Sequence, residues 1–507
     1  MSSNQTDGLR QLQAMTDTLQ RTRTNRRNLI RGGAAATASA LGAGPLTTEA
    51  APGTDTPASR LVLAQGLAPG AALVSSLRLP MRGIGSSQTG PLLLGDIANW
   101  YEVGCPIPLA VTVFAVDGLV PEGSSPAEIL ADYNALVERL DATPGGLAML
   151  PVEMIDSRVN TLDIDGLNPH LASGTETEPV VKVGVAGDII FGRNGGNYQR
   201  KYGDYAFPMY QVKDFLSTFD VTVCNFECFV SETIEPPEID NPNTLDFLTR
   251  PESLEGMAMA GIDAVTMANN HAVFSYSGYG LPGMRDTMRY LNEAGITPFG
   301  VGESLEEARA PWTIDINGTS IAFYGVDGVT ANLDYPDSIG VQLMGDSPVA
   351  ATASGGGTNP LMMDQNLADI ERLAGEYDIV LPYFHMGEQY IWSPVQWVVD
   401  VSRQCIDAGA TAVLSAHPHA TMGMEFYNGK PIFYSIGNFV YDQMFSVETR
   451  QGYFLDMTFR GSKLVSFKTH GVEIMDFVQP RFMSGREQAA FMDRFWRSVD
   501  LTRLKFG

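Results

Sequence analysis

The sequence predicts an α/β protein in which a large domain follows a smaller N-terminal α/β domain. From residue 180 onward, apolar runs of strand length alternate with amphipathic helical windows. This alternation is typical of a mostly parallel sheet with helices on its faces. The 507 residues are enough for two or three domains, and 44% of them are hydrophobic, which supplies a sizeable core. Extensive disorder is therefore excluded.

The charge balance argues against nucleic acid as a partner. The chain has 33 Lys and Arg against 58 Asp and Glu, a formal net charge of −25. Binding a phosphate backbone requires clustered basic side chains. The four cysteines are too scattered for a disulfide scaffold or for a zinc site built from paired thiolates. Any metal ion must therefore be bound by His, Asp, Glu and Asn.

Residues 1–50 resemble a twin-arginine export signal with a disordered head. Arg26 and Arg27 precede a Gly/Ala/Leu stretch that is shorter than the ~18 residues needed to span a membrane. Small residues at Thr48 and Ala50 suit cleavage before Ala51. We expect the twin-arginine machinery to export the protein, to the periplasm, the cell surface or the medium. An ordinary disordered tail is the alternative.

Residues 51–175 are expected to form an accessory domain, with its clearest helical periodicity at residues 127–137. The stretches 94–104, 144–151 and 162–169 resemble part of a phosphate-binding-protein-like periplasmic solute-binding fold. The Gly/Ser/Thr-rich loop that grips the ligand in that family is not evident here. A polar, turn-rich linker is predicted at residues 173–179.

The domain predicted at residues 180–480 begins with alternating strands and helices. Its buried strands are expected at residues 180–190, 221–226, 264–267, 321–326, 379–384 and 412–415. Its helices are expected at residues 252–260, 283–294, 364–377 and 395–408.

Antiparallel strands should follow this α/β core. Asn428 and Gly429 interrupt the apolar run at residues 424–437, and this dipeptide is the strongest short hairpin signal. Further strands are expected at 452–459 and 464–472. Residues 481–507 should form a closing helix.

Histidines are concentrated just after predicted strands. His271, His385, His417 and His419 all lie in such positions, where the carboxyl ends of strands form the ligand-binding crevice of open α/β sheets. Carboxylate and amide side chains occupy the same kind of position: Asp188, Asn225 and Glu227. Because alternate residues of a strand share a side, Asn225 and Glu227 should face the crevice while Cys224 and Cys228 face the core.

Together with Asn270, which precedes His271, five of these side chains have the composition of a site for two divalent metal ions: Asp188, Glu227, His385, His417 and His419. A shared carboxylate can bridge two ions, and imidazole and amide groups can complete each coordination shell. Mixed nitrogen and oxygen ligands suit manganese, iron or zinc. In the competing interpretation, His417 and His419 are ordinary loop residues.

At residues 181–445 the chain resembles the CapA family of poly-γ-glutamate capsule biosynthesis proteins, which has a calcineurin-like metallophosphoesterase fold. The resemblance rests on six motifs in order: Val185 to Asp188, Asn225 to Glu227, Ala268 to Ala272, His385 to Glu388, Ser415 to His419, and Tyr434 to Phe439. It implies mixed sheets flanked by helices.

The resemblance also implies a role for each candidate ligand. Asp188, Glu227 and His419 would surround one metal ion, and Glu227 would bridge to a second ion held by Asn270, His385 and His417. His271 would act as a general acid or as an electrostatic partner of the transition state. Relatives usually place an Asp shortly after the His-Ala step, but no carboxylate occurs here before Asp286, so the partner that would orient His271 is missing.

Other residues are weaker candidates for substrate contact. We assign substrate binding to Asn225, Glu388 and Arg193. In the alternative interpretation, Glu388 is an exposed loop residue and Arg193 is a lone surface residue. Tyr390 could also contact substrate. Asn438 is interpreted as a turn residue.

Three functions are compatible with these features. The first is an exported metal-dependent hydrolase that acts on a phosphoester or on another bond of an anionic envelope polymer. The second is a non-catalytic factor for poly-γ-glutamate assembly or transport, working with membrane proteins of capsule synthesis. The third, solute binding by the N-terminal domain, has the least support.

Overall fold

The computed structural model describes residues 70–507, apart from residues 173, 175–177, 233–246, 275–277, 333 and 335–348. The predicted export signal, its cleavage site and most of the predicted linker lie outside the described residues. Among the described helices, none combines the length and apolar composition that a membrane crossing requires.

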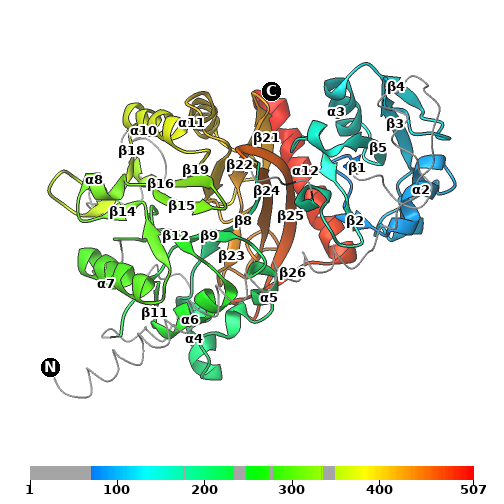
Figure 1. Cartoon of the computed structure of the whole chain (residues 1–507). Coiled ribbons are helices and arrows are strands. Elements are labelled where there is room, and N and C mark those ends of the chain that lie inside the picture. The colour runs from blue at the N-terminus through cyan, green and yellow to red at the C-terminus, as the bar shows by residue number, and fades with distance from the viewer. Residues whose placement is uncertain are drawn as a thin grey trace.

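Two large mixed sheets form the centre of the molecule (Figure 1). The first has the order β13 (Thr297–Phe299), β12 (Ala264–Thr266), β9 (Val221–Phe226), β8 (Val180–Ile189), β24 (Gln451–Arg460), β25 (Lys463–Met475) and β26 (Gln479–Phe482), and β23 (Asn438–Val440) also pairs with β8. The second has the order β15 (Trp312–Ile316), β16 (Thr319–Asn332), β19 (Ile379–Met386), β20 (Val413–Ala416), β22 (Lys430–Ser435) and β21 (Met422–Tyr427), and β18 (Pro360–Leu361) also pairs with β16.

The two sheets pack face to face, and helices cover their outer faces. Valines 181, 183 and 185 of β8 share one apolar cluster with Phe323 of β16 and Leu381 of β19. On the outer side of the first sheet lie α6 (Glu252–Ala260) and α7 (Gly280–Glu293). On that of the second lie α10 (Met363–Glu376) and α11 (Gln396–Asp407). The predicted α/β class, with mixed sheets flanked by helices, is confirmed.

The predicted elements of this region are present. All four expected helices form, and α7 begins three residues earlier than expected, at Gly280. Asn428 and Gly429 join antiparallel β21 and β22, with φ angles of 50° and 75°. Positive φ at both central residues is what a two-residue type I′ hairpin requires.

The described N-terminal residues form a separate five-stranded sheet in the order β4 (Glu128–Leu130), β3 (Thr112–Val116), β5 (Gly146–Pro151), β1 (Ala71–Ser75) and β6 (Asn160–Thr161). The helix predicted at residues 127–137 is partly wrong. Its first residues form β4, which pairs in parallel with β3, and α3 (Tyr133–Asp141) begins only after Asp132. The Asp132 side chain accepts a hydrogen bond from the Ala135 amide and so caps the helix.

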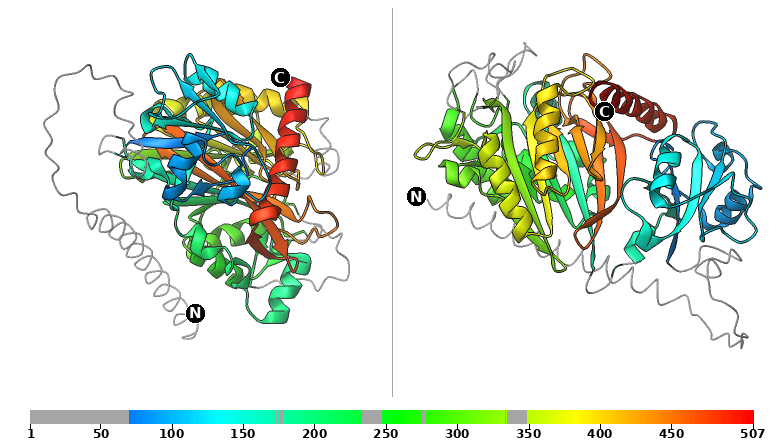
Figure 2. Two further views of the ribbon diagram at one scale, coloured as in Figure 1. Left: turned by 90° about the vertical axis from the view of Figure 1, so that its right-hand side faces the viewer. Right: turned by 90° about the horizontal axis from the view of Figure 1, so that it is seen from above.

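The closing helix α12 (Gly485–Phe506) lies between the N-terminal sheet and the central sheets (Figure 2). Its Trp496 and Phe495 belong to the apolar cluster between the two large sheets. On the same face of the helix, one turn after Trp496, Asp500 accepts two hydrogen bonds from Arg78, at 3.1 and 2.6 Å. Ion pairs of partly exposed side chains contribute little, so apolar packing holds this junction.

One buried histidine should make stability depend on pH. His470 of β25 packs against Phe215 with ring centroids 4.7 Å apart, and burial lowers its pKa from 6.5 to about 4 although Asp456 opposes the shift. Above about pH 6.5 the imidazole is neutral in both states, so its contribution to stability is fully present. As pH falls toward about 4, only the unfolded chain takes up the proton, and about 1.4 kcal/mol is lost per pH unit.

We therefore expect His470→Gln to reduce the slope of unfolding free energy against pH between about pH 6 and 4. Denaturant unfolding of both proteins at several pH values measures this slope. Equal slopes in the two proteins would show that His470 is not buried as a neutral group.

Candidate metal centre

Polar side chains gather at the carboxyl ends of strands in both large sheets. Asp188 lies at the end of β8, Asn225 lies opposite it in β9, and Glu227 follows β9. His385 lies near the end of β19, and residues 417–419 follow β20, its parallel neighbour. Parallel strands end at the same edge of a sheet, and the two edges bring these buried groups together.

Three ligand-type atoms cluster around the Nε2 atom of His385. Its Nε2 atom lies 2.8 Å from Asn270 Oδ1, 3.2 Å from His417 Nδ1 and 3.5 Å from Glu227 Oε1. Atoms that share one ion at bond lengths of about 2.1 Å are separated by roughly these distances. All four side chains are buried. The arrangement is therefore that of a compact set of ligands.

A second group adjoins the first through Asp188. His419 Nδ1 lies 3.2 Å from Asp188 Oδ2 and 2.9 Å from Asn438 Oδ1. The Asn225 amide nitrogen donates to Asp188 Oδ1 at 2.7 Å and lies 3.2 Å from His385 Nδ1. Asn225 therefore ties the two groups together, on the face of β9 that the sequence predicts.

The surroundings of the Glu227 carboxylate indicate whether the site fits a metal ion. It is fully buried, and neither carboxylate oxygen has a hydrogen-bond partner among the described residues. Burying such a carboxylate is costly unless a cation compensates it. Asp188, Glu227 and His385 each place one ligand atom within 4.8 Å of the others. These residues fit a divalent ion with nitrogen and oxygen ligands.

Acids and histidines set each other's charge in this site. Burial opposes ionisation of Asp188, but His419 and His385 outweigh it and lower the pKa of the carboxyl. Burial also opposes protonation of His385 and His419, but nearby carboxylates outweigh it and raise both pKa values. Glu227 and Asp188 act on His385, and chiefly Asp188 acts on His419. Burial and the neighbouring histidines hold the pKa of His417 well below its usual value. A cation bound here would compete with the protons on His385 and His419 that Glu227 and Asp188 stabilise.

His271 lies at the border of the cluster. Its Nε2 is 3.8 Å from Glu227 Oε1, and its ring packs against Phe247 with centroids 4.5 Å apart. Its Nδ1 is buried and has no hydrogen-bond partner among the described residues. Three residues of the following loop, 275–277, lie outside the described part of the chain.

Backbone strain is concentrated here. Nine non-glycine residues of the described chain have positive φ, and four of them belong to this region: Arg193, Tyr390, His417 and His419, at 54°, 62°, 103° and 53°. Such conformations cost of order 1–3 kcal/mol each and persist only where the surroundings enforce them. The surrounding fold therefore fixes the two histidines of the 417–419 loop in place.

The interpretation of Asn438 as a turn residue is wrong. Asn438 begins β23, directly opposite Asp188 of β8. Its amide nitrogen donates to the carbonyl of Thr449 at 2.7 Å, and its oxygen faces His419 Nδ1. Asn438 therefore orients His419, because its own amide is held by the backbone.

Sequence reasoning also missed Asn269. Its amide nitrogen donates to Asn225 Oδ1 at 3.0 Å and to the Phe226 carbonyl at 2.9 Å, and its oxygen accepts from the His271 amide at 3.0 Å. Its position beside Asn270 and His271 was the available signal. Asn269 links the ends of β9 and β12 below the cluster.

Tyr390 forms an outer wall. Its amide donates to the Pro418 carbonyl at 2.8 Å, and its hydroxyl accepts from Gln443 at 2.8 Å. The ring lies 6.3 Å from the His419 ring and is 44% exposed. Tyr390 therefore lies between His419 and the surface of the protein.

The weaker candidates lie in different surroundings. Arg193 is buried and forms an ion pair with Asp442 at 2.6 Å, so it is not a lone surface arginine. Glu388 is half-buried and lines a separate cavity of about 490 Å³ with Trp392 and Lys505. Cys224 and Cys228 are buried in the apolar core, as expected.

Comparisons with known proteins agree with the motifs. The model of the family described as "Bacterial capsule synthesis protein PGA_cap" matches residues 182–443. "PGA biosynthesis protein CapA" of Bacillus subtilis is 29% identical over 275 residues, covering 53% of this chain and 65% of the relative. "Capsule biosynthesis protein CapA" of Bacillus anthracis is 27% identical over 266 residues, covering 51% of this chain and 59% of the relative.

Both matches thus span less than two thirds of the relatives' own length. Among solved structures, a 5'-nucleotidase from Candida albicans aligns with 64% of this chain and 57% of its own, at 11% identity. The TM-score of this alignment is 0.35. The family model covers just over half of the 507 residues, and on that match the chain belongs to the bacterial capsule synthesis protein family.

Proposed function

We propose that this protein is exported, takes part in making a capsule or related exopolymer, and acts there as a hydrolase that depends on two divalent metal ions. Its substrate would be a phosphoester or another bond of an anionic envelope polymer. Family membership supports the capsule role. The hydrolase assignment rests on the buried Glu227 carboxylate, which lacks a hydrogen-bond partner among the described residues and lies 3.5 Å from His385.

The ligands divide into two sets around Glu227. One set is Asn270, His385 and His417, and the other is Asp188 and His419. When bound, two such cations lower the pKa of a water molecule and neutralise charge that develops on the substrate. Manganese, iron and zinc suit this mixture of nitrogen and oxygen ligands.

His271 is the residue best placed to handle a proton. Burial holds its pKa well below the usual value, so the imidazole is uncharged at neutral pH. A neutral imidazole still carries one N–H, which can donate a hydrogen bond to a leaving oxygen. Asn269 fixes the backbone of His271 by accepting its amide hydrogen bond.

A second candidate function is a metal-binding factor for polymer assembly without turnover. The observation that favours it is the buried Nδ1 of His271, which no described residue holds in one tautomer. Catalytic histidines commonly have such an orienting partner, and an unoriented ring is a poorer acid.

Turnover of a generic phosphodiester distinguishes the two functions. We expect the full chain, loaded with Mn²⁺, to hydrolyse bis(4-nitrophenyl) phosphate, and Asp188→Asn and His417→Ala to lower kcat/KM at least about 100-fold. Asp400→Asn, on the exposed face of α11, is the matched control and should keep full activity. Metal-loaded protein that hydrolyses neither this diester nor a phosphomonoester would favour the assembly factor.

Asn438→Ala should weaken metal binding without removing a ligand. Loss of the amide that orients His419 is expected to lower Mn²⁺ affinity about 10- to 100-fold, the usual effect of losing such a partner. Calorimetric titration measures the affinity, with Asn292→Ala on the exposed side of α7 as the control. Equal affinities in wild type and Asn438→Ala would refute the orienting role.

A further inference from the structure

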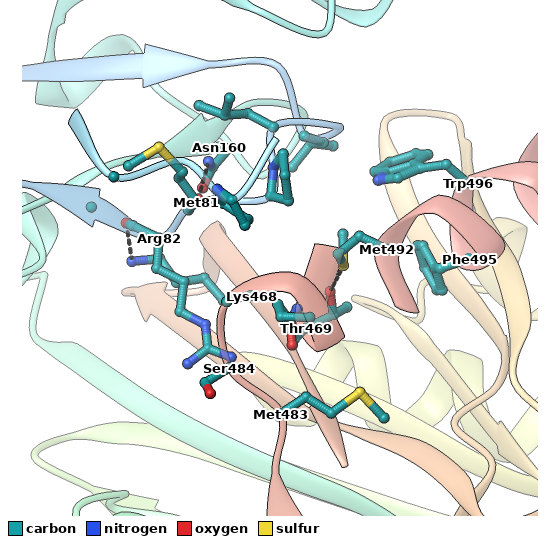
Figure 3. Close-up of a pocket in the computed structure, with 18 of the residues that line it drawn as sticks. Met81, Arg82, Asn160, Lys468, Thr469, Met483, Ser484, Met492, Phe495 and Trp496 are labelled. Carbon is teal, nitrogen blue, oxygen red and sulfur yellow. Dashed lines mark hydrogen bonds between the residues drawn. The ribbon is translucent and has the colours of Figure 1, made fainter. Parts of the chain in front are cut away.

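A cavity of about 350 Å³ lies where the N-terminal sheet meets β25 and the start of α12 (Figure 3). Its lining comes from parts of residues 77–83 and 104–106 and from Asn160 on one side, and from residues 467–469 and parts of residues 483–496 on the other. It shares no lining residue with the candidate metal centre. This volume lies within the range of small-molecule sites, which often form between domains.

One side of the cavity is apolar. Met483 lines it just before α12 begins, Met492, Phe495 and Trp496 line it from the middle of α12, and Met81 lines it from the N-terminal part (Figure 3). Methionine side chains adapt to the shape of a ligand, and aromatic rings offer a rigid surface. This side suits a hydrocarbon group.

The other side carries a cation. The Arg82 guanidinium forms no hydrogen bond and no ion pair with the described residues, and its Nη2 atom is buried. Burial lowers the pKa of Arg82 even though Asp456 and Asp163 are near, so these acids do not fully compensate the buried charge. Figure 3 shows the Arg82 side chain pointing toward Ser484, the N-cap residue of α12.

The two nearby acids already face other groups. Asp163 forms an ion pair with the buried Lys468, and Asp456 lies 3.4 Å from His470. Lys468 also donates to the Arg82 carbonyl at 3.4 Å, which places its charge beside that of Arg82. Arg82 thus remains the cation of this group without an ion-pair partner among the described residues. A partly buried cation without such a partner favours an anionic ligand.

We propose that this cavity binds a small organic carboxylate, whose anionic head pairs with Arg82 and whose apolar body packs against Met483, Met492 and Phe495. A guanidinium matches a carboxylate through two parallel hydrogen bonds, which favours this head group. Inorganic anions alone would leave the apolar side without a partner. The site is independent of the proposed hydrolase activity.

Three probes of the full chain by calorimetric titration test this site. Hexanoate has both a carboxylate and an apolar body, hexanamide has only the body, and inorganic phosphate has only the charge. We expect hexanoate to bind with a Kd of about 1 mM or tighter, and the other two at least about tenfold more weakly.

Two variants locate the binding. Arg82→Gln removes the cation, and Ser484→Asp places a carboxylate beside Arg82 while keeping a good N-cap residue for α12. Each should weaken hexanoate binding at least about tenfold. Arg497→Gln, on the exposed face of α12, is the matched control and should bind as the wild type does.

The proposal is overturned if hexanoate fails to bind the wild type at about 10 mM, since that is well above the expected Kd. Equal binding by the wild type and Ser484→Asp would also overturn it, even if Arg82→Gln did not fold. Tighter binding of phosphate than of hexanoate would show a bare anion site instead.

Discussion

Glu227→Gln is expected to remove at least one of two bound metal ions while leaving the fold intact. The change keeps the shape of the side chain and removes only the charge. Among the residues that the structure describes, Glu227 is the carboxylate that lies next to both His385 and His271. Wild-type protein purified without chelators should carry about two transition-metal ions per chain, and the variant fewer than about one. Elemental analysis of both proteins measures this content.

A second measurement separates lost metal from lost structure. A ligand at 100 times its Kd stabilises the folded state by about 2.7 kcal/mol, so Mn²⁺ should raise the Tm of the wild type but hardly that of Glu227→Gln. Glu371→Gln, on the exposed face of α10, is the control and should respond like the wild type. If Glu227→Gln bound as much metal as the wild type, Glu227 could not be a ligand.

The position of most of the cluster was predictable from the sequence because it follows from a property of parallel sheets. Asp188, Glu227 and His385 each come at the end of an apolar run, and parallel strands bring their carboxyl ends to one edge. The local sequence was therefore sufficient to predict that these three side chains lie close together. The helices of the same region were predictable for a related reason, since their apolar periodicity is also local.

The surroundings of Asn438 and Arg193, which the sequence did not predict, depend on contacts between distant parts of the chain. Asn438 reaches the cluster only because β23 pairs with β8, about 250 residues earlier, and no local pattern encodes that pairing. Arg193 is buried because Asp442 lies beside it from the segment after β23. The strand β4 lies within a helical pattern, and its pairing with β3 overrides local propensity.

Gly187→Ala should be the most destabilising single-methyl change near the site. A Cβ atom at this position would lie only 1.8 Å from the carbonyl oxygen of Gly437, so the two backbone segments would have to separate. Asp188 donates its amide to that same carbonyl, and Asn438 follows it. The substitution thus pushes apart the strands that carry Asp188 and Asn438.

We expect Gly187→Ala to lower the free energy of unfolding by about 3–5 kcal/mol, in the range of severe overpacking, and to reduce metal binding with it. Denaturant unfolding and elemental analysis measure the two effects. Gly375→Ala is the control, since a Cβ at this exposed position of α10 meets nothing within 4 Å. Alanine should there stabilise the helix by about 0.5–1 kcal/mol. Near-equal stabilities of the two variants would mean that β8 and residues 436–438 do not approach as closely as the fold requires. In that case Asn438 would not lie close enough to His419 to orient it.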